Sequence, residues 1–297
     1  MYKTIVLYLI MLPAIFIGTM AMVKNNLPLS IWIQNIIIWM LGCFLGLLFL
    51  NLSKKRKSTK SRSDFIPILM TILLLIIPFF TSNSNNIHRW LSIGPILIYT
   101  ASIFLPLAII YFDKTIIHYP EGYTLGLVLI ILLILLFQPD AGQLTSFSCA
   151  ISLIIFRKID KPVLKYTSLF VLIIFITLTW VFIDNLAPVS YVENILFLVK
   201  DMGMLWFIFG IISLILLVLP FFTLRAYHWS YVSLGVYFLT EILVTFFGNF
   251  PMPIMGYGIS PIIGYMIAMT YVIKHCNCGM NSISPMSKDA RKGYQSK

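Results

Sequence analysis

Three ionisable side chains of this 297-residue chain lie in short polar segments between long apolar runs. Arg89 directly precedes Trp90, and Asp140 lies two positions after Gln138. Glu193 lies where an apolar segment begins, so it is partly desolvated and a stronger base than a carboxylate in water. The planar guanidinium of Arg89 matches the oxygens of a phosphate group. These residue types would suit a site that binds a pyrophosphate and removes a proton.

Each of these residues also has a structural interpretation. Trp90 would lie in the aromatic belt at a membrane surface, with Arg89 reaching headgroup phosphates. Asp140 would cap a helix N-terminus after a tight turn, and Glu193 would complement a helix dipole. The residue pattern alone leaves both interpretations open.

The elements that position these residues are predicted to be membrane helices. Apolar residues make up 60% of the chain and charged residues 10%, and the mean hydropathy is +0.95. A spanning helix needs about 20 mainly apolar residues. Ten such segments are predicted, at 5–23, 29–52, 65–82, 95–112, 122–137, 142–156, 163–184, 194–223, 229–248 and 257–274.

This segmentation predicts an all-α polytopic bundle. Residues 1–275 would form a single transmembrane domain and residues 276–297 a polar cytoplasmic tail. The short loops leave no room for a separate soluble domain, and long apolar runs such as 127–137 lack the alternation of a membrane β-barrel.

The basic residues predict the orientation of the bundle. Ten helices place all Lys and Arg on one side except Lys24, Arg89 and Lys200, and basic loops face the cytoplasm. Both termini are therefore predicted to be cytoplasmic. The net charge of +11 is interpreted as this topology signal, with anionic lipid headgroups rather than nucleic acid as its partner.

Two further features lie within or beside the apolar segments. Glu241 lies inside a predicted helix, where an ionised carboxylate costs about 2.5–3.5 kcal/mol, so it would form an inter-helix hydrogen bond or line a polar substrate path. The segment 248–261 is rich in Gly and Pro and is predicted to form a cavity wall, because irregular backbone at membrane depth must be buried in protein or face water.

The cysteines give little functional information. His275, Cys276 and Cys278 near the end of the last helix suit juxtamembrane acylation or metal binding, but a closed zinc site needs four ligands. We therefore predict no metal site from them.

Three motifs occur in one order along the chain: Arg-Trp at 89–90 with Gly-Pro at 94–95, Gln-Pro-Asp-Ala-Gly at 138–142, and Pro-Ile-Met-Gly-Tyr-Gly-Ile-Ser at 253–260. In these motifs the chain resembles the SEDS family (shape, elongation, division and sporulation), the peptidoglycan glycosyltransferases of the FtsW, RodA and SpoVE type. The resemblance implies ten helices with both termini in the cytoplasm, which agrees with the segmentation above.

Two departures from the family pattern bear on activity. The family carries an acid and a lysine after its Leu-Gly-Pro stretch, whereas residues 99–105 of this chain are uncharged. The long external loop between helices seven and eight is cut to about ten residues. With one deletion allowed, Glu193 falls where the family has its presumed catalytic Asp.

The resemblance implies a multi-pass protein of the bacterial plasma membrane, where lipid II is polymerised on the outer face with undecaprenyl pyrophosphate leaving. Glu193 would be the base. Arg89, with Lys200 or a divalent cation (Mg²⁺ or Mn²⁺) bound through Asp140, would stabilise the charge on the leaving pyrophosphate. The other implied substrate-binding residues are Trp90, Gln138, Tyr257 and Ser260. A class B penicillin-binding protein is the implied protein partner.

Two other classes of function remain open at this point. A catalytically degenerate scaffold or regulator of a cell-wall complex would explain the shortened loop and the missing acid and lysine. A transporter of a lipid-linked precursor would explain Glu241 and the broken final loop.

Overall fold

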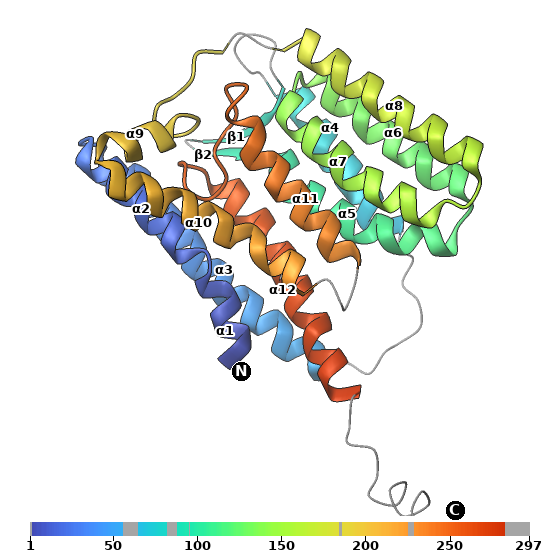
Figure 1. Cartoon of the computed structure of the whole chain (residues 1–297), viewed down its shortest axis with the longest axis horizontal. Coiled ribbons are helices and arrows are strands. Elements are labelled where there is room, and N and C mark those ends of the chain that lie inside the picture. Colours follow the sequence, from blue (N-terminus) through green and yellow to red (C-terminus); the bar gives the residue numbers. More distant parts are fainter. Residues whose placement is uncertain are drawn as a thin grey trace, which may run out of the picture.

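The computed structural model describes residues 2–55, 65–81, 88–94, 96–183, 186–224 and 229–282 of the chain (Figure 1). Helices make up most of this part. The elements are α1 (Tyr2–Leu9), α2 (Leu12–Lys24), α3 (Leu29–Lys55), α4 (Phe65–Ile76), the 3-10 helix η1 (Ile77–Phe80), β1 (Trp90–Ile93), β2 (Ile96–Tyr99), α5 (Thr100–His118), α6 (Glu121–Phe137), α7 (Ala141–Lys158), α8 (Pro162–Val181), α9 (Ile195–Asp201), α10 (Met204–Thr223), α11 (Trp229–Val244) and α12 (Ile259–Ser282).

The predicted all-α membrane architecture is confirmed. Each of the ten predicted segments contains one helix or two consecutive helices. Among the described residues, six helices are long and apolar enough to cross a membrane: Ile5–Lys24, Leu29–Ser53, Thr100–His118, Pro162–Val181, Met204–Thr223 and Ile259–Cys276. Shorter apolar helices lie at Phe65–Phe80, Glu121–Phe137 and Trp229–Val244.

The prediction of a helix at 95–112 is wrong at the start of that range. Strands β1 and β2 pair in an antiparallel manner with Trp90 opposite Tyr99, and α5 begins only at Thr100. Gly94 has a φ of 60°, a left-handed value that suits glycine in the turn. A short apolar run fits a strand as well as a helix, which is why the pattern did not reveal the change at residue 100.

The predicted helix at 194–223 is also two helices. Gly203 lies between α9 and α10 with a φ of 125°, which residues other than glycine rarely adopt. Helix α9 therefore has seven residues and a direction of its own, and it packs against α2 and α10.

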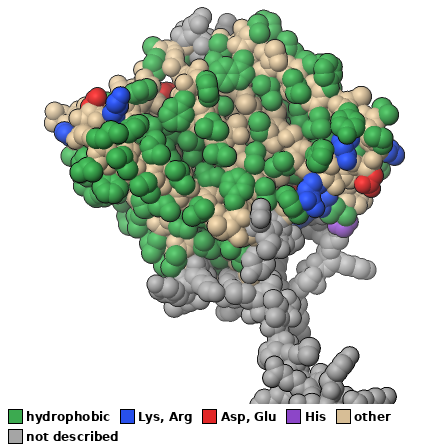
Figure 2. All heavy atoms as spheres, in the orientation of Figure 1, with side chains coloured by type: hydrophobic (Ala, Val, Ile, Leu, Met, Phe, Trp, Pro, Cys, Tyr) green, Lys and Arg blue, Asp and Glu red, His purple; other side chains and the backbone are tan. Residues whose placement is uncertain are grey.

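The bundle has a buried centre and an apolar outer surface. Of the apolar window in α5, 72% is buried inside the protein, against 11% in α3 and 17% in α8. Helices α5, α7, α11 and α12 therefore form the centre, and α3 and α8 lie at the periphery (Figure 1). Figure 2 shows a band of hydrophobic side chains between two rims where charged side chains gather, as a membrane-embedded surface requires.

The first and last helices meet at one end of the bundle. Helix α1 contacts α12, and the Tyr8 hydroxyl lies 2.7 Å from the Thr270 hydroxyl. Figure 1 shows the start of α1 and the end of α12 on the same side of the molecule. This agrees with an even number of crossings.

Small residues let two central helices approach closely. A Cβ atom added at Gly264 of α12 would overlap the main-chain carbonyl of Ser102 in α5, whose carbon would lie 3.1 Å away. A Cβ atom at Gly18 of α2 would likewise overlap the carbonyl of Met255. Because lipid offers no hydrophobic drive between helices, such close backbone contacts are a main source of packing.

We predict that Gly264→Ala lowers stability by about 1–3 kcal/mol, since α5 and α12 must separate to admit a methyl group. Gly126→Ala in α6 is the matched control, because a Cβ atom there has nothing within 4 Å. Thermal unfolding of both purified proteins in the same detergent measures the difference. Equal midpoints would contradict the close contact of α5 with α12.

Candidate functional site

The junction of α6 and α7 is buried and hydrogen-bonded within the protein. Gln138 and Asp140 are both completely buried. The Gln138 amide donates to the Leu75 carbonyl in α4 at 2.6 Å. Asp140 caps α7, accepting from the Gln143 main-chain N–H at 3.2 Å. The capping role expected for Asp140 is therefore present in the structure.

Arg89 holds the end of α6. Its Nε donates to the Gln138 carbonyl at 3.4 Å, and its terminal nitrogen donates to the Pro139 carbonyl. The side chain is only 3% exposed, and its guanidinium lies 5.9 Å from the Trp90 ring. A cation in this position complements the dipole at the C-terminus of a helix.

Tyr99 connects this junction to the hairpin and to α12. Its hydroxyl donates to Asp140 Oδ2 at 2.6 Å, and its main-chain N–H donates to Ser260 Oγ at 2.8 Å. Its ring also contacts that of Trp90 across the hairpin. Tyr99 was not predicted as a site residue, because it lies in an apolar run with no local signal of a polar role.

Glu241 joins three helices through its side chain. Its Oε1 accepts from Gln143 Nε2 at 2.7 Å and from the Ser102 hydroxyl at 3.4 Å. The Tyr237 hydroxyl donates to Gln143 Oε1 at 2.5 Å, which fixes the orientation of that amide. These contacts match the inter-helix hydrogen bond expected for Glu241. Glu241 Oε2 is buried and has no hydrogen bond among the described residues.

Glu193 lies in a second polar region, the loop 186–194 before α9. Its Oε2 accepts from the Val189 main-chain N–H at 2.7 Å, and the residue is partly exposed. This loop lies against the loop between α11 and α12. Met252 N–H donates to the Val192 carbonyl at 3.1 Å, and Tyr257 N–H donates to the Tyr191 carbonyl at 2.8 Å.

Helix α3 holds the α11–α12 loop from the other side. The Asn35 amide donates to the Gly256 carbonyl at 2.9 Å and accepts from the Gly258 N–H at 3.3 Å. Asn35 is only 1% exposed. The irregular backbone predicted to be a cavity wall is thus hydrogen-bonded within the protein, as burial at membrane depth requires.

Tyr257 lies at the edge of this loop pair. Its hydroxyl donates to Gln34 Oε1 at 3.0 Å, and its ring packs edge-on against Tyr191. Tyr257 is partly exposed, and its phenol serves as a hydrogen-bond donor to α3.

Most of the predicted site residues fall into three groups. The first is the buried outer-end network, which consists of Arg89, Gln138, Asp140 and Ser260 together with Tyr99. Arg89 bonds the carbonyls of Gln138 and Pro139, and Tyr99 bonds Asp140 and Ser260, so the chain segment 138–140 links the two sets of hydrogen bonds. The second group is Glu193 and Tyr257, which belong to the adjoining pair of loops. Tyr257 lies three residues before Ser260 in the sequence. Lys200 is exposed near the end of α9.

The donor set at Asp140 does not favour a bound divalent cation. Both carboxylate oxygens already accept hydrogen bonds, from Tyr99 and from Gln143. Among the described residues, no group of three or more His, Cys, Asp and Glu side chains could hold a metal ion. The divalent cation expected from the sequence stays a prediction.

An apolar groove lies apart from these polar regions. It has a volume of about 360 Å³ and runs between α10 and α11. Its lining includes Leu214, Phe222 and Leu243 and is almost entirely apolar. A groove of this kind accepts hydrocarbon, either a lipid chain or an apolar helix.

Comparisons with known proteins identify the fold. No protein-family model and no curated protein sequence matches the chain. The solved structure of the rod shape determining protein RodA from Thermus thermophilus matches with a TM-score of 0.65 and 16% identity, covering 91% of this chain and 96% of that one. An aspartate-to-alanine mutant of the same protein gives a TM-score of 0.66 and 15% identity, covering 91% and 97%.

A third similar structure is described as the structural coordination of polymerization and crosslinking by a peptidoglycan synthase complex. Its TM-score is 0.64 at 16% identity, with 91% of this chain and 97% of that chain covered. The chain is therefore a polytopic membrane protein with the fold of RodA, as the SEDS resemblance predicted.

We predict that Tyr99→Phe destabilises the protein by about 1–3 kcal/mol, because buried Asp140 loses a hydrogen bond and no water replaces it. Tyr166→Phe is the matched control, since Tyr166 is 63% exposed on the outside of α8. Thermal unfolding in detergent compares the two variants with the wild type. A Tyr99→Phe protein as stable as the control would remove Tyr99 from the network.

Proposed function

We propose that this chain is a SEDS protein that binds lipid II at the outer end of the bundle and polymerises it into glycan. The observation that carries the proposal is the RodA fold over 91% of the chain. The family motifs at 89–95, 138–142 and 253–260 support it, because hydrogen bonds bring parts of all three together.

In this proposal Glu193 is the general base. The 4-hydroxyl of one sugar attacks the anomeric carbon of the next lipid-linked unit, and the bond from that carbon to the pyrophosphate oxygen breaks. Glu193 takes the proton of the attacking hydroxyl. The Val189 N–H supports this role by orienting the carboxylate within the loop.

Lys200 is the cation that we propose for the departing pyrophosphate. It is exposed and lies seven residues after Glu193 in the same segment. Arg89 is buried against the carbonyls of Gln138 and Pro139, so we assign it the role of holding the α6–α7 junction beneath the substrate. Tyr257 would present a partly exposed polar side chain to the sugar.

The location and partner follow from the same proposal. The protein would lie in the bacterial plasma membrane and act on its outer face in division, elongation or sporulation. A class B penicillin-binding protein would crosslink the glycan. The apolar groove between α10 and α11 could take a transmembrane segment of such a partner.

We predict that purified wild-type protein polymerises fluorescent lipid II and that Glu193→Gln lowers the rate by about 10²–10⁴-fold, the usual contribution of a general base. Asp201→Asn is the matched control, because Asp201 is an exposed carboxylate on the same segment. Gel separation of the glycan products measures the rates. Undiminished polymer from Glu193→Gln would refute the assigned base.

A second candidate function is a scaffold or regulator that binds lipid II without polymerising it. The burial of Arg89, Gln138 and Asp140 favours this alternative, because residues predicted to bind substrate hold the protein together instead.

We predict that the two candidates differ in one experiment on the wild type. A scaffold would retain lipid II, or co-purify with a class B penicillin-binding protein, and yield no glycan in the polymerisation assay. Equilibrium binding of fluorescent lipid II, measured on the same preparation, separates this outcome from an unfolded protein. Glycan formation by the isolated chain would exclude the scaffold.

A further inference from the structure

The turn between α7 and α8 combines cations with exposed apolar side chains. Arg157 and Lys165 lie at its two sides, and the residues between and beside them include Phe156, Val163 and Tyr166. These three side chains are 57%, 75% and 63% exposed. Figure 2 shows Lys and Arg side chains gathered on a rim of the apolar band.

Two cations of this turn are held by aromatic rings. The Arg157 guanidinium carbon lies 3.7 Å from the centre of the Trp229 ring at the start of α11, and Lys165 Nζ lies 5.2 Å from the Phe156 ring. Among the described residues, neither forms an ion pair with a carboxylate. Arg157 is exposed and Lys165 is partly exposed, so an anion from outside the protein can reach both cations.

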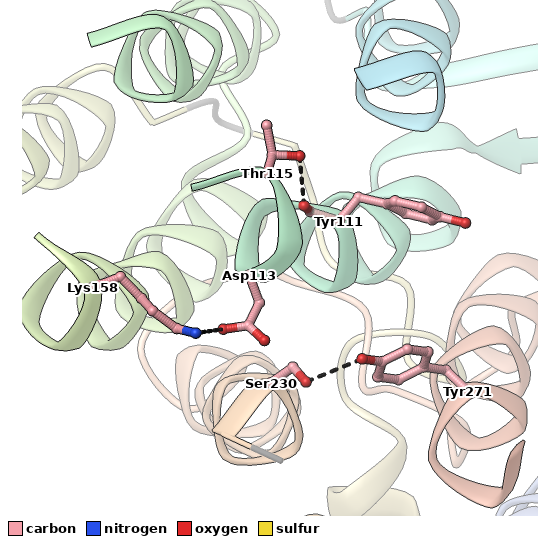
Figure 3. Close-up of polar contacts among 6 residues, drawn as sticks. All are labelled: Tyr111, Asp113, Thr115, Lys158, Ser230 and Tyr271. Carbon is pink, nitrogen blue, oxygen red and sulfur yellow. Dashed lines mark hydrogen bonds and ion pairs between the residues drawn. The ribbon is translucent and has the colours of Figure 1, made fainter. Parts of the chain in front are cut away.

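The other cations of the turn are already paired. Lys158 Nζ lies 3.6 Å from Asp113 Oδ1 of α5, as Figure 3 shows, and Lys161 Nζ lies 3.8 Å from Glu121 Oε2 of α6. These pairs fasten the turn to the neighbouring helices. Asp160 is an exposed carboxylate within the turn and opposes an incoming anion, so Arg157 and Lys165 are the cations without a carboxylate partner among the described residues that would attract it.

The side of the membrane on which the α7–α8 turn lies determines which anions it can meet. The basic residues of the sequence assign this turn to the cytoplasmic end of the bundle. The cytoplasmic leaflet is rich in anionic lipids, and basic pockets at helix ends bind their headgroups. A free phosphate would use the two cations but not the exposed apolar side chains beside them.

We propose that the α7–α8 turn binds an anionic phospholipid of the cytoplasmic leaflet. Arg157 and Lys165 contact the phosphate, and an acyl chain runs along Phe156, Val163 and Tyr166. The inference depends on membrane insertion and orientation alone, so it stands or falls independently of lipid II polymerisation.

Bound lipid would stabilise the centre of the bundle. The turn is joined to α5 by the Lys158–Asp113 pair and to α11 by Arg157 on Trp229. Figure 3 shows Asp113 beside the Ser230–Tyr271 contact, which links α11 to α12 at 3.3 Å. A ligand that binds only the folded protein raises its thermal midpoint.

The test compares phosphatidylglycerol with phosphatidylcholine, each added to the purified protein in detergent. We expect phosphatidylglycerol to raise the thermal midpoint more, and native mass spectrometry to detect it bound. Arg157→Gln and Lys165→Gln should each weaken binding about fivefold, the equivalent of about 1 kcal/mol per cation at a membrane surface. Lys24→Gln, at an exposed cation on the opposite end, should bind like the wild type.

Several results would overturn the proposal. Equal effects of the two lipids on the wild type would show that the charge of the headgroup is not recognised. Equal stabilisation by glycerol phosphate would indicate a small-anion site. Unchanged phosphatidylglycerol binding by the double variant, or an equal loss in Lys24→Gln, would place the lipid elsewhere. If the double variant does not fold, the two single variants decide by the mass-spectrometric count of bound lipid.

Discussion

The hydrogen bond from Tyr99 to Asp140 is the contact on which the outer end of this protein depends. A bilayer provides no water, so every main-chain group that leaves a helix there must find a partner in the protein. Tyr99 and Asp140 meet at the point where the hairpin, the α6–α7 junction and the start of α12 come together. Arg89 completes the arrangement by donating hydrogen bonds to the carbonyls of Gln138 and Pro139 at the end of α6.

Because of this constraint, the buried network and the two loops beside it differ in what they can contact. The buried outer-end network has little freedom to contact a substrate, because its side chains are buried and most of their polar atoms are hydrogen-bonded within the protein. The pair of loops beside it is different, since Glu193 is partly exposed and Tyr257 lies at an edge. In the proposed function, the network supplies a rigid base and the loops supply the reacting groups, which fits the usual placement of chemistry on loops over a fixed scaffold.

The sequence predicts the positions of the helices well and the hydrogen-bond partners of individual side chains poorly. Long apolar runs define membrane helices by composition alone, and all ten segments contain helix. The hairpin at 90–99 was missed because a short apolar run has no period that excludes a strand. Asn35 and Tyr99 were missed because their partners, Gly256 and Asp140, lie 221 and 41 positions away. Asp140 and Arg89 were identified, but only the fold reveals that their hydrogen bonds are internal.

The break at Gly203 has a mechanical consequence. Residues 186–203 are attached to the bundle by the main-chain bonds of Tyr191 and Val192, by the packing of α9 against α2 and α10, and by the turn into α10. Glu193 lies two residues before α9 and Lys200 lies near its C-terminal end, so one short helix separates the two side chains. If this helix moved as a rigid unit, the proposed base Glu193 and the proposed cation Lys200 would move together, and the distance between them would stay constant.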